Sequence, residues 1–179
     1  GSPEGGLQGI RETVEKTRER VHPPQNPLPL RDGEALEVAG KRLRVLWTPG
    51  HADGHAAFYL EAEGVLLAGD ALLEKVSPNV GLWAYTRENP LKDFLRSLDR
   101  LADLGARVAY AGHFGPIADV RQRAEELKAH HQARLEALLA LLDGPKTAWE
   151  LSLHLFPQEL DPAGRRLAFA ETLAHLEDL

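Results

Sequence analysis

Three residues of types that commonly bind metal ions stand in similar local sequences along the chain. His51 ends the stretch TPGH, Asp70 ends LAGD and His113 ends YAGH, so each directly follows a glycine. Glycine lets the backbone turn sharply and approach an ion closely. Two imidazoles and one carboxylate suit Zn²⁺, Fe²⁺ or Mn²⁺ and leave a coordination position open for water. An ion held in this way would lower the pKa of that water toward about 7, which makes hydroxide available for hydrolysis.

Each of these residues also has an ordinary structural explanation when it is taken alone. A histidine after a glycine is often a loop residue that hydrogen-bonds to nearby groups, and an aspartate at the end of a strand often stabilises a turn. The metal interpretation therefore depends on whether the three residues meet in the fold.

The expected order of strands brings the three residues to one edge of a sheet. Short connections between strands make neighbours antiparallel, whereas the amphipathic helix expected over 90–104 forms a crossover between two parallel strands. The strands that precede His51, Asp70 and His113 then all end at the same edge, where sites of α/β proteins usually form. The alternation of apolar residues predicts these strands at 34–38, 41–47, 56–62, 64–69 and 106–112.

The segments on either side of this sheet are expected to be helical. A surface helix over 7–22 ends at Pro23-Pro24 and leads into an irregular linker. A long apolar stripe predicts a helix over 117–142, and two shorter helices follow at 147–155 and 163–178, the first with a capping box of Thr147 and Glu150. We therefore expect a helix and linker at 1–33, a main domain at 34–144 and a helical tail at 145–179.

The three motifs resemble the last three metal motifs of the metallo-β-lactamase-fold hydrolases, in particular the glyoxalase II-like and endoribonuclease branches. The stretches TPGHADGHAAFYL, LLAGDAL and YAGHFGPI match in order and context, and the resemblance covers about residues 34–144. It implies that His51 binds a first metal, Asp70 bridges two metals and His113 binds the second. His55, the second histidine of the GHxxGH pattern, would support the site without binding metal. The implied cofactor is zinc, one or two ions, with iron or manganese as alternatives.

The HxHxDH motif, which supplies most metal ligands of this family and the aspartate that handles the attacking water, does not occur in the 179 residues. Because no other histidine has an adjacent acid at suitable spacing, we expect none to replace it; these are His22, His130, His131, His154 and His175. Neighbouring residues on a helix point about 100° apart, so His130 and His131 are expected to be one surface and one partly buried residue. The expected result is weak metal binding and little catalysis unless another chain, such as a missing N-terminal half, completes the set of ligands. The catalytic residue for the attacking water is unknown.

The resemblance implies an α/β fold, namely the C-terminal half of an αββα sandwich with a mixed sheet and flanking helices. The tail at 145–179 resembles a truncated winged helix. The first hypothesis for function is a metal-dependent hydrolase in which metal-bound hydroxide attacks an ester, a thioester or a phosphodiester, so the substrate is a small-molecule ester or thioester, or RNA. Trp83 and Tyr85, in the loop after Asp70, line the substrate cleft or are ordinary packing residues.

Two alternatives belong to other classes of function. If half of the sandwich is missing, an apolar sheet face is exposed, and the chain could be an inactive scaffold that forms a homodimer. The tail could instead bind nucleic acid through Arg165 and Arg166, although nearby acidic residues offset them. The simpler interpretation, which we favour, is that its apolar residues pack it against the main domain; these are Trp149, Leu153, Phe156, Leu167, Phe169 and Leu173.

The composition excludes several other classes of protein. The net charge of −6 argues against a chain that coats nucleic acid or an anionic membrane. The chain contains no cysteine, so disulfides, thiolate nucleophiles and cysteine-bound zinc are excluded. Neither a membrane span nor a signal peptide is visible, which favours a cytoplasmic protein. The ratio of 15 arginines to 6 lysines is typical of a thermophile with a GC-rich genome.

Overall fold

A single mixed sheet forms the centre of the computed structural model, which describes residues 15, 20–22 and 24–179. Its six strands lie in chain order: β1 (Ala35–Val38), β2 (Lys41–Trp47), β3 (Ala56–Leu60), β4 (Val65–Gly69), β5 (Val108–Ala111) and β6 (Pro116–Ile117). All neighbouring strands are antiparallel except β4 and β5, which are parallel. The predicted strand order and crossover are confirmed, whereas the helix predicted at 7–22 lies almost entirely outside the described residues.

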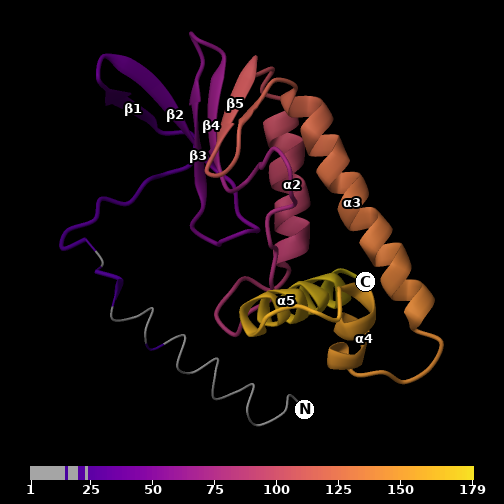
Figure 1. The fold of residues 1–179 in the computed structure, drawn as a ribbon. Coiled ribbons are helices and arrows are strands. Elements are labelled where there is room, and N and C mark those ends of the chain that lie inside the picture. Colours follow the sequence, from indigo (N-terminus) through magenta and orange to yellow (C-terminus); the bar gives the residue numbers. More distant parts are fainter. Residues whose placement is uncertain (1–14, 16–19, 23) are drawn as a thin grey trace.

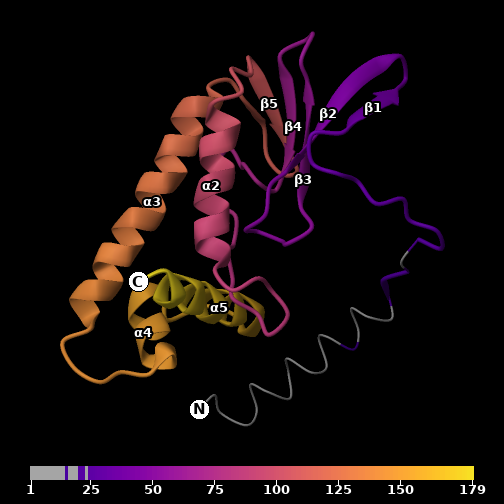
Figure 2. The ribbon, with the colours of Figure 1, turned by 180° about the vertical axis from the view of Figure 1, so that it is seen from behind.

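Helices cover one face of the sheet. Figures 1 and 2 show α2 next to the sheet, α3 outside it, and α5 across the end of α2. Their bounds are α2 (Pro90–Ala102), α3 (Val120–Leu141), α4 (Ala148–Leu155) and α5 (Pro162–Asp178). The core lies between the sheet and α2, where Leu66 and Ala109 meet buried residues such as Phe94 and Leu98. The sequence therefore forms one half of a sandwich, as the α/β prediction required.

Local signals set most of the element boundaries. Ala39 and Gly40 have φ values of 52° and 74°, the left-handed geometry of a two-residue hairpin turn between β1 and β2. The Asn89 side chain accepts a hydrogen bond from the backbone of Lys92 at 2.8 Å, which fixes the start of α2. The capping box predicted for α4 is confirmed.

The start of α3 differs from the prediction. We expected this helix from residue 117, but Ile117 pairs with β5 as part of β6, and α3 begins at Val120. The Asp119 side chain accepts a hydrogen bond from the backbone of Gln122 at 2.8 Å and caps the helix. An apolar residue such as Ile117 fits the edge of a helical stripe as well as a buried strand position, so periodicity could not separate the two.

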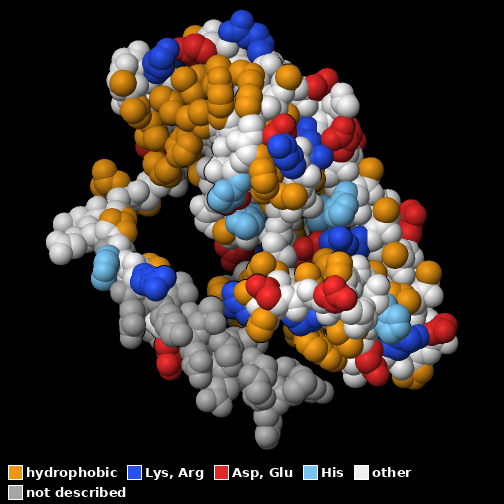
Figure 3. Space-filling view, in the orientation of Figure 1, with side chains coloured by type: hydrophobic (Ala, Val, Ile, Leu, Met, Phe, Trp, Pro, Cys, Tyr) orange, Lys and Arg blue, Asp and Glu red, His pale blue; other side chains and the backbone are white. Residues whose placement is uncertain are grey.

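The other face of the sheet is open in the described part of the chain. The register places Leu36, Leu43, Phe58, Leu67 and Tyr110 on this face, which we call the open face. Tyr110 is 52% exposed and Leu67 is 38% exposed. Figure 3 shows hydrophobic side chains gathered over the sheet on this side. An exposed apolar face of this kind was expected for half of a sandwich.

A chain of buried hydrogen bonds joins α3 to α5. The Nδ1–H of His175 donates to the carbonyl of Glu171 at 2.7 Å, so the Nε2 of His175 accepts from the Nδ1–H of His131 at 3.1 Å. The Nε2 of His131 in turn accepts from the hydroxyl of Ser77 at 3.0 Å. Both histidines are neutral in this arrangement. His131, expected to be partly buried, is fully buried, while His130 is exposed.

This histidine pair makes stability sensitive to acid. Burial lowers the pKa of His131 to about 3 and that of His175 to about 4, from an ordinary value of 6.5. Below about pH 6.5 the unfolded chain binds a proton at each histidine, but the folded chain does not. The free energy of unfolding is therefore highest above that pH and falls as the pH drops toward the pKa values of the two histidines in the folded state. Each unit of depressed pKa corresponds to about 1.4 kcal/mol, so between pH 7 and pH 5 we expect a loss of roughly 2 kcal/mol for each histidine, or about 4 kcal/mol for the pair. Urea unfolding at both pH values measures it.

The matched variant carries His131→Leu together with His175→Leu, because replacing both histidines by apolar groups of similar size leaves neither imidazole without its partner. The Ser77 hydroxyl loses His131 but keeps the carbonyl of Pro78 as an acceptor at 3.2 Å. Its free energy of unfolding should fall less than that of the wild type over the same pH interval. Equal losses in the two proteins would contradict the prediction.

Candidate metal centre

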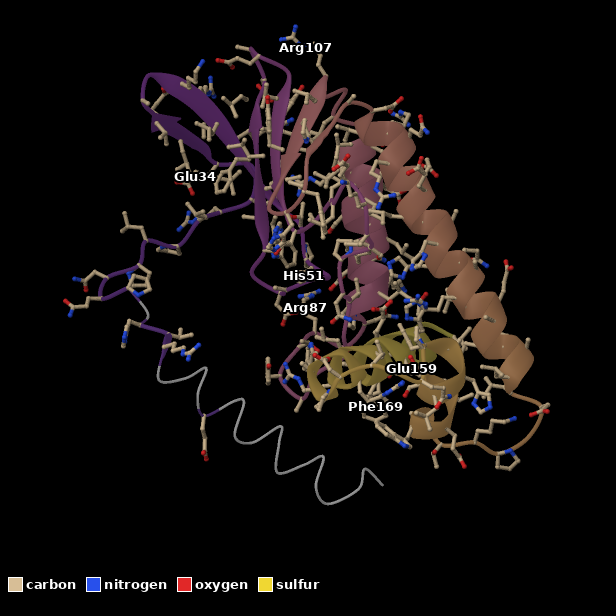
Figure 4. All side chains as sticks on the ribbon, viewed as in Figure 1. Glu34, His51, Arg87, Arg107, Glu159 and Phe169 are labelled. Atoms are coloured by element: carbon tan, nitrogen blue, oxygen red, sulfur yellow. The ribbon has the colours of Figure 1, made fainter. Side chains whose placement is uncertain are left out.

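The ends of β2, β4 and β5 bring His51, Asp70 and His113 together. The Nε2 atom of His51 lies 3.7 Å from Oδ2 of Asp70, and the Nε2 atom of His113 lies 3.7 Å from Oδ1. These distances exceed the usual range for a hydrogen bond. The two imidazoles therefore face different oxygens of one carboxylate without bonding directly to it. His51 lies between the end of the sheet and α5 in Figure 4.

The surroundings of Asp70 show whether an ion would fit. Its Oδ1 atom is buried and has no hydrogen-bond partner among the described residues. An unpaired buried acceptor is unfavourable. Two ligand atoms that bind one tetrahedral zinc ion lie about 3.4 Å apart, close to the separations seen here. Both ligand pairs and the unpaired oxygen therefore fit metal binding at the Asp70 carboxylate, with His51 at one oxygen and His113 at the other. The three residues do not bring their ligand atoms within 4.8 Å of one another as a single cluster.

The ring of His51 is oriented by its other nitrogen. The Nδ1–H group donates to the backbone carbonyl of Asn79 at 2.9 Å. The proton on Nδ1 leaves Nε2 unprotonated in the neutral ring, so a lone pair faces Asp70. Backbone carbonyls orient metal-binding histidines in this way in many sites.

His55 uses both of its ring nitrogens within the protein. Its Nε2 accepts from the backbone N–H of Asp70 at 3.0 Å, so its Nδ1–H donates to the hydroxyl of Thr48 at 2.7 Å. Burial lowers the pKa of His55, and the nearby His51 lowers it further against the opposing effect of Asp70. The neutral ring thus holds the backbone of Asp70, which is consistent with a supporting residue and leaves no nitrogen free for an ion.

At each glycine that precedes a candidate ligand, a neighbouring residue lies too close for a side chain to fit. A Cβ at Gly50 would lie 2.4 Å from the Cβ of Phe94, and one at Gly69 would lie 2.7 Å from Nε2 of His55. A Cβ at Gly112 would lie 2.5 Å from Oδ1 of Asp70. Gly50 and Gly69 also have φ values of 133° and 52°, which other residues rarely adopt. The repeated glycine is therefore a packing requirement of this edge of the sheet.

The remaining residues singled out in the sequence lie as follows. Tyr85 is 83% exposed, and Trp83 is half-buried beneath the guanidinium of Arg166, 4.7 Å from the ring centre. A role for either aromatic residue in substrate binding stays a prediction. Arg165 donates to the backbone carbonyls of residues 152, 157 and 158, where it supports the end of α4.

One cluster of ligand-type residues was missed. His131, Glu171 and His175 offer ligand atoms within 4.8 Å of one another. The expectation that no other histidine has a suitably spaced acid was wrong, because Glu171 precedes His175 by four residues on the same helix. That spacing was visible in the sequence, but the contribution of His131 from α3 was not.

This cluster is a closed hydrogen-bond network. The carboxylate of Glu171 is paired with Arg134 and accepts from the side-chain amide of Asn79, while the histidines bond to each other as described above. An ion would have to displace these bonds and would lie beside the positive charge of Arg134. We therefore assign the cluster to the packing of α3, α5 and the loop after Asp70.

Comparison with known proteins agrees with the geometry at the sheet edge. Residues 2–113 match the family model of the metallo-beta-lactamase superfamily. The chain belongs to the metallo-β-lactamase superfamily. Residues 135–179 match a second model, the metallo-beta-lactamase-like C-terminal domain. Superfamily membership supports a hydrolase that binds divalent metal.

Relatives in the superfamily are longer than this chain. The probable metallo-hydrolase YqjP of Bacillus subtilis is 36% identical over 140 residues, which make up 75% of this chain and 44% of the relative. The crystal structure of a metallo-beta-lactamase family protein from Thermus thermophilus is 90% identical with a TM-score of 0.90, and the match covers all of this chain and 55% of the other. A beta-lactamase domain protein from Burkholderia ambifaria is 36% identical with a TM-score of 0.82, covering 87% and 47%. The chain thus spans about half the length of these proteins.

Within the described residues, no helix combines the length and the apolar character needed to cross a membrane.

The glycine requirement can be tested at Gly50. In Gly50→Ala the new methyl group would overlap Phe94, including its backbone atoms, so the loop that carries His51 must separate from α2. We expect the free energy of unfolding to fall by about 3 kcal/mol in urea titrations. Gly54→Ala is the matched control in the same loop, because its Cβ would meet nothing within 4 Å. Equal stabilities of the two variants would show that this contact does not constrain the loop.

Proposed function

We propose that the chain carries part of the active site of a metal-dependent hydrolase, with His51, Asp70 and His113 as metal ligands. The observation that carries this proposal is the buried Oδ1 atom of Asp70, which has no hydrogen-bond partner in the described residues and faces an imidazole nitrogen at 3.7 Å. The second oxygen of the same carboxylate faces His51 at the same distance. This arrangement suits a carboxylate that bridges two metal positions.

The metal would supply Lewis acidity and lower the pKa of a bound water molecule. Zinc, iron and manganese all fit two imidazoles and a carboxylate. The residues of this chain would hold the ion and keep His51 and Asp70 oriented through Asn79 and His55. The HxHxDH motif, whose aspartate handles the attacking water in this family, does not occur in the 179 residues, so catalysis by this chain alone is expected to be weak.

A thioester is the substrate class to test first, ahead of simple esters and phosphodiesters. A relative named atrochrysone carboxyl ACP thioesterase, from Aspergillus fumigatus, is 28% identical over 123 residues, which make up 68% of this chain and 36% of that protein. A phosphodiester finds less support because Arg165 is already bonded to backbone carbonyls and the net charge is −6. Trp83 and Tyr85 are the aromatic residues that we propose for the wall of the substrate cleft.

The metal site makes a direct prediction. Because binding is expected to be weak, protein purified without chelator and equilibrated with zinc, iron or manganese by dialysis should bind about one or more ions per chain by elemental analysis. His51→Ala combined with His113→Ala should remove them, while His154→Ala, an exposed histidine on α4, should not. Gly112→Ala should weaken zinc binding about tenfold, because its methyl group displaces the carboxylate of Asp70.

Metal content that is unchanged in the double histidine variant would contradict the proposed ligands. Hydrolysis of an S-acyl thioester, followed with a thiol reagent, extends the test to the reaction. Any activity should be lost in the same double variant and kept in His154→Ala.

The open face favours a second candidate function, self-association as a scaffold. We propose that in this form a second copy covers the face, because Leu67 and Tyr110 are exposed there among other apolar side chains. The occupant of this face is then another copy of the chain, and the assembly is a homodimer.

Light scattering at micromolar concentration should therefore give the mass of a dimer. Leu67→Lys combined with Tyr110→Lys places two charges on the open face and should give a monomer. Leu139→Lys, at an exposed apolar position on α3, is the control and should leave the mass unchanged. A monomer mass for the wild type would exclude this assembly.

A further inference from the structure

The loop between Asp70 and α2 lies along the C-terminal helix α5. The side-chain amide of Asn79 donates to Oε2 of Glu171 at 2.9 Å and to the carbonyl of Leu167 at 3.3 Å. Further along, the backbone N–H of Leu82 donates to the carbonyl of Ala170 at 3.0 Å. Residues 79–82 of this loop are therefore held by α5 at both ends.

Asn79 connects this helix to the candidate metal centre. Its side chain bonds to α5, while its backbone carbonyl accepts the hydrogen bond from Nδ1 of His51 at 2.9 Å. The position of that carbonyl decides which way the ring of His51 faces. A shift of the loop would therefore reach the metal ligand directly.

Glu171 is the residue of α5 that holds Asn79. Its carboxylate is buried, it is paired with Arg134, and the guanidinium of Arg134 lies 4.4 Å from the ring centre of Phe156. Burial raises the pKa of Glu171, while Arg134 and Asn79 lower it. Burying a carboxylate lowers stability unless hydrogen bonds or ion pairs replace its lost hydration. Here Arg134 and Asn79 supply these interactions.

We propose that Glu171 is a positioning residue for the candidate metal centre: through Asn79 it fixes the carbonyl that orients His51. Helix α5 of the C-terminal tail then helps to orient a metal ligand, in addition to packing against the main domain. The inference rests on the proposed function where zinc binding is concerned, but the orientation of His51 can be measured without metal.

An exchange of partners provides the test. Asn79→Asp places a carboxylate against that of Glu171, so the two repel and the loop shifts. Glu171→Gln alone leaves two amides that can still hydrogen-bond to each other, which is a milder change at Asn79, although it also removes the charge that pairs with Arg134. The double variant Asn79→Asp with Glu171→Gln restores an amide and a carboxylate in exchanged positions, with the same total charge as the wild type.

Asn89 offers a matched control. Its side-chain amide donates to Oδ1 of Asp178 at 2.9 Å, so it also joins the segment before α2 to an acid on α5. Asn89→Asp creates the same kind of repulsion away from Asn79, and aspartate can still cap α2. Any general effect of loosening α5 would appear in this variant as well.

Two measurements are made on each variant. Long-range ¹H–¹⁵N NMR at about pH 8, without metal, reports which ring nitrogen of His51 carries the proton. Competition with a chromophoric chelator reports zinc affinity. We expect Asn79→Asp to give a mixture of His51 tautomers and to bind zinc about tenfold more weakly, with the double variant within about threefold of the wild type. Glu171→Gln should be intermediate, and Asn89→Asp should match the wild type.

The outcomes separate this inference from the proposed function. An unchanged His51 tautomer in Asn79→Asp, or failure of the double variant to restore it, would overturn the positioning role. If the wild type binds no zinc, the proposed metal site fails, while the NMR comparison still decides the role of Glu171. Should Asn79→Asp fail to fold in circular dichroism, the Glu171→Gln and double variants carry the same comparison.

Discussion

Crowding around the carboxylate of Asp70 is the constraint on which the site depends. A Cβ atom at Gly112 would collide with one oxygen of this carboxylate. The backbone N–H of Asp70 donates to the ring of His55, and a Cβ atom at Gly69 would collide with that ring. The parallel pairing of β4 and β5, with a register shift between Leu67 and Gly69, brings these strand ends so close. Only residues without a side chain fit at these two positions. The glycines, the strand pairing and the buried acid therefore form one arrangement, and a change in any of them moves the others.

The sequence was sufficient for the framework of this arrangement. Short connections and one helical crossover determine which strands run parallel, and that determines which ends share an edge. The sequence alone therefore assigns the three glycine-plus-ligand stretches to one edge. The start of α3 was less predictable, because Ile117 satisfies either a strand or a helix and the capping role of Asp119 decides between them. The local sequence allows Ile117 to be either a helix or a strand residue, and its pairing with β5 makes it a strand residue.

The tail could not be predicted in the same way. Apolar residues were expected to face the main domain, yet Leu167 is 39% exposed while Glu171, Thr172 and His175 are buried on α5. The buried face of α5 is mixed: it combines Ala168, Ala170 and Ala174 with polar residues whose partners include Asn79, Arg134 and His131. Hydrophobic periodicity describes packing against an apolar surface and does not identify a buried face that is partly a hydrogen-bond network. The partners come from three separate segments, so no spacing within α5 identifies them.

Support for the three candidate ligands is uneven, and this has a chemical consequence. His51 is fixed by Asn79 and the backbone of Asp70 by His55, but the side chain of His113 is 68% exposed. The residue after it, Phe114, has a φ of 68°, and the next backbone N–H, at Gly115, donates to Glu74 at 2.8 Å. The backbone just after His113 is therefore held, while no hydrogen bond among the described residues orients its ring. Metal affinity depends on how well ligands are oriented before binding. An ion would thus find the His51 and Asp70 side of the centre already arranged, and the ring of His113 would lose conformational freedom on binding.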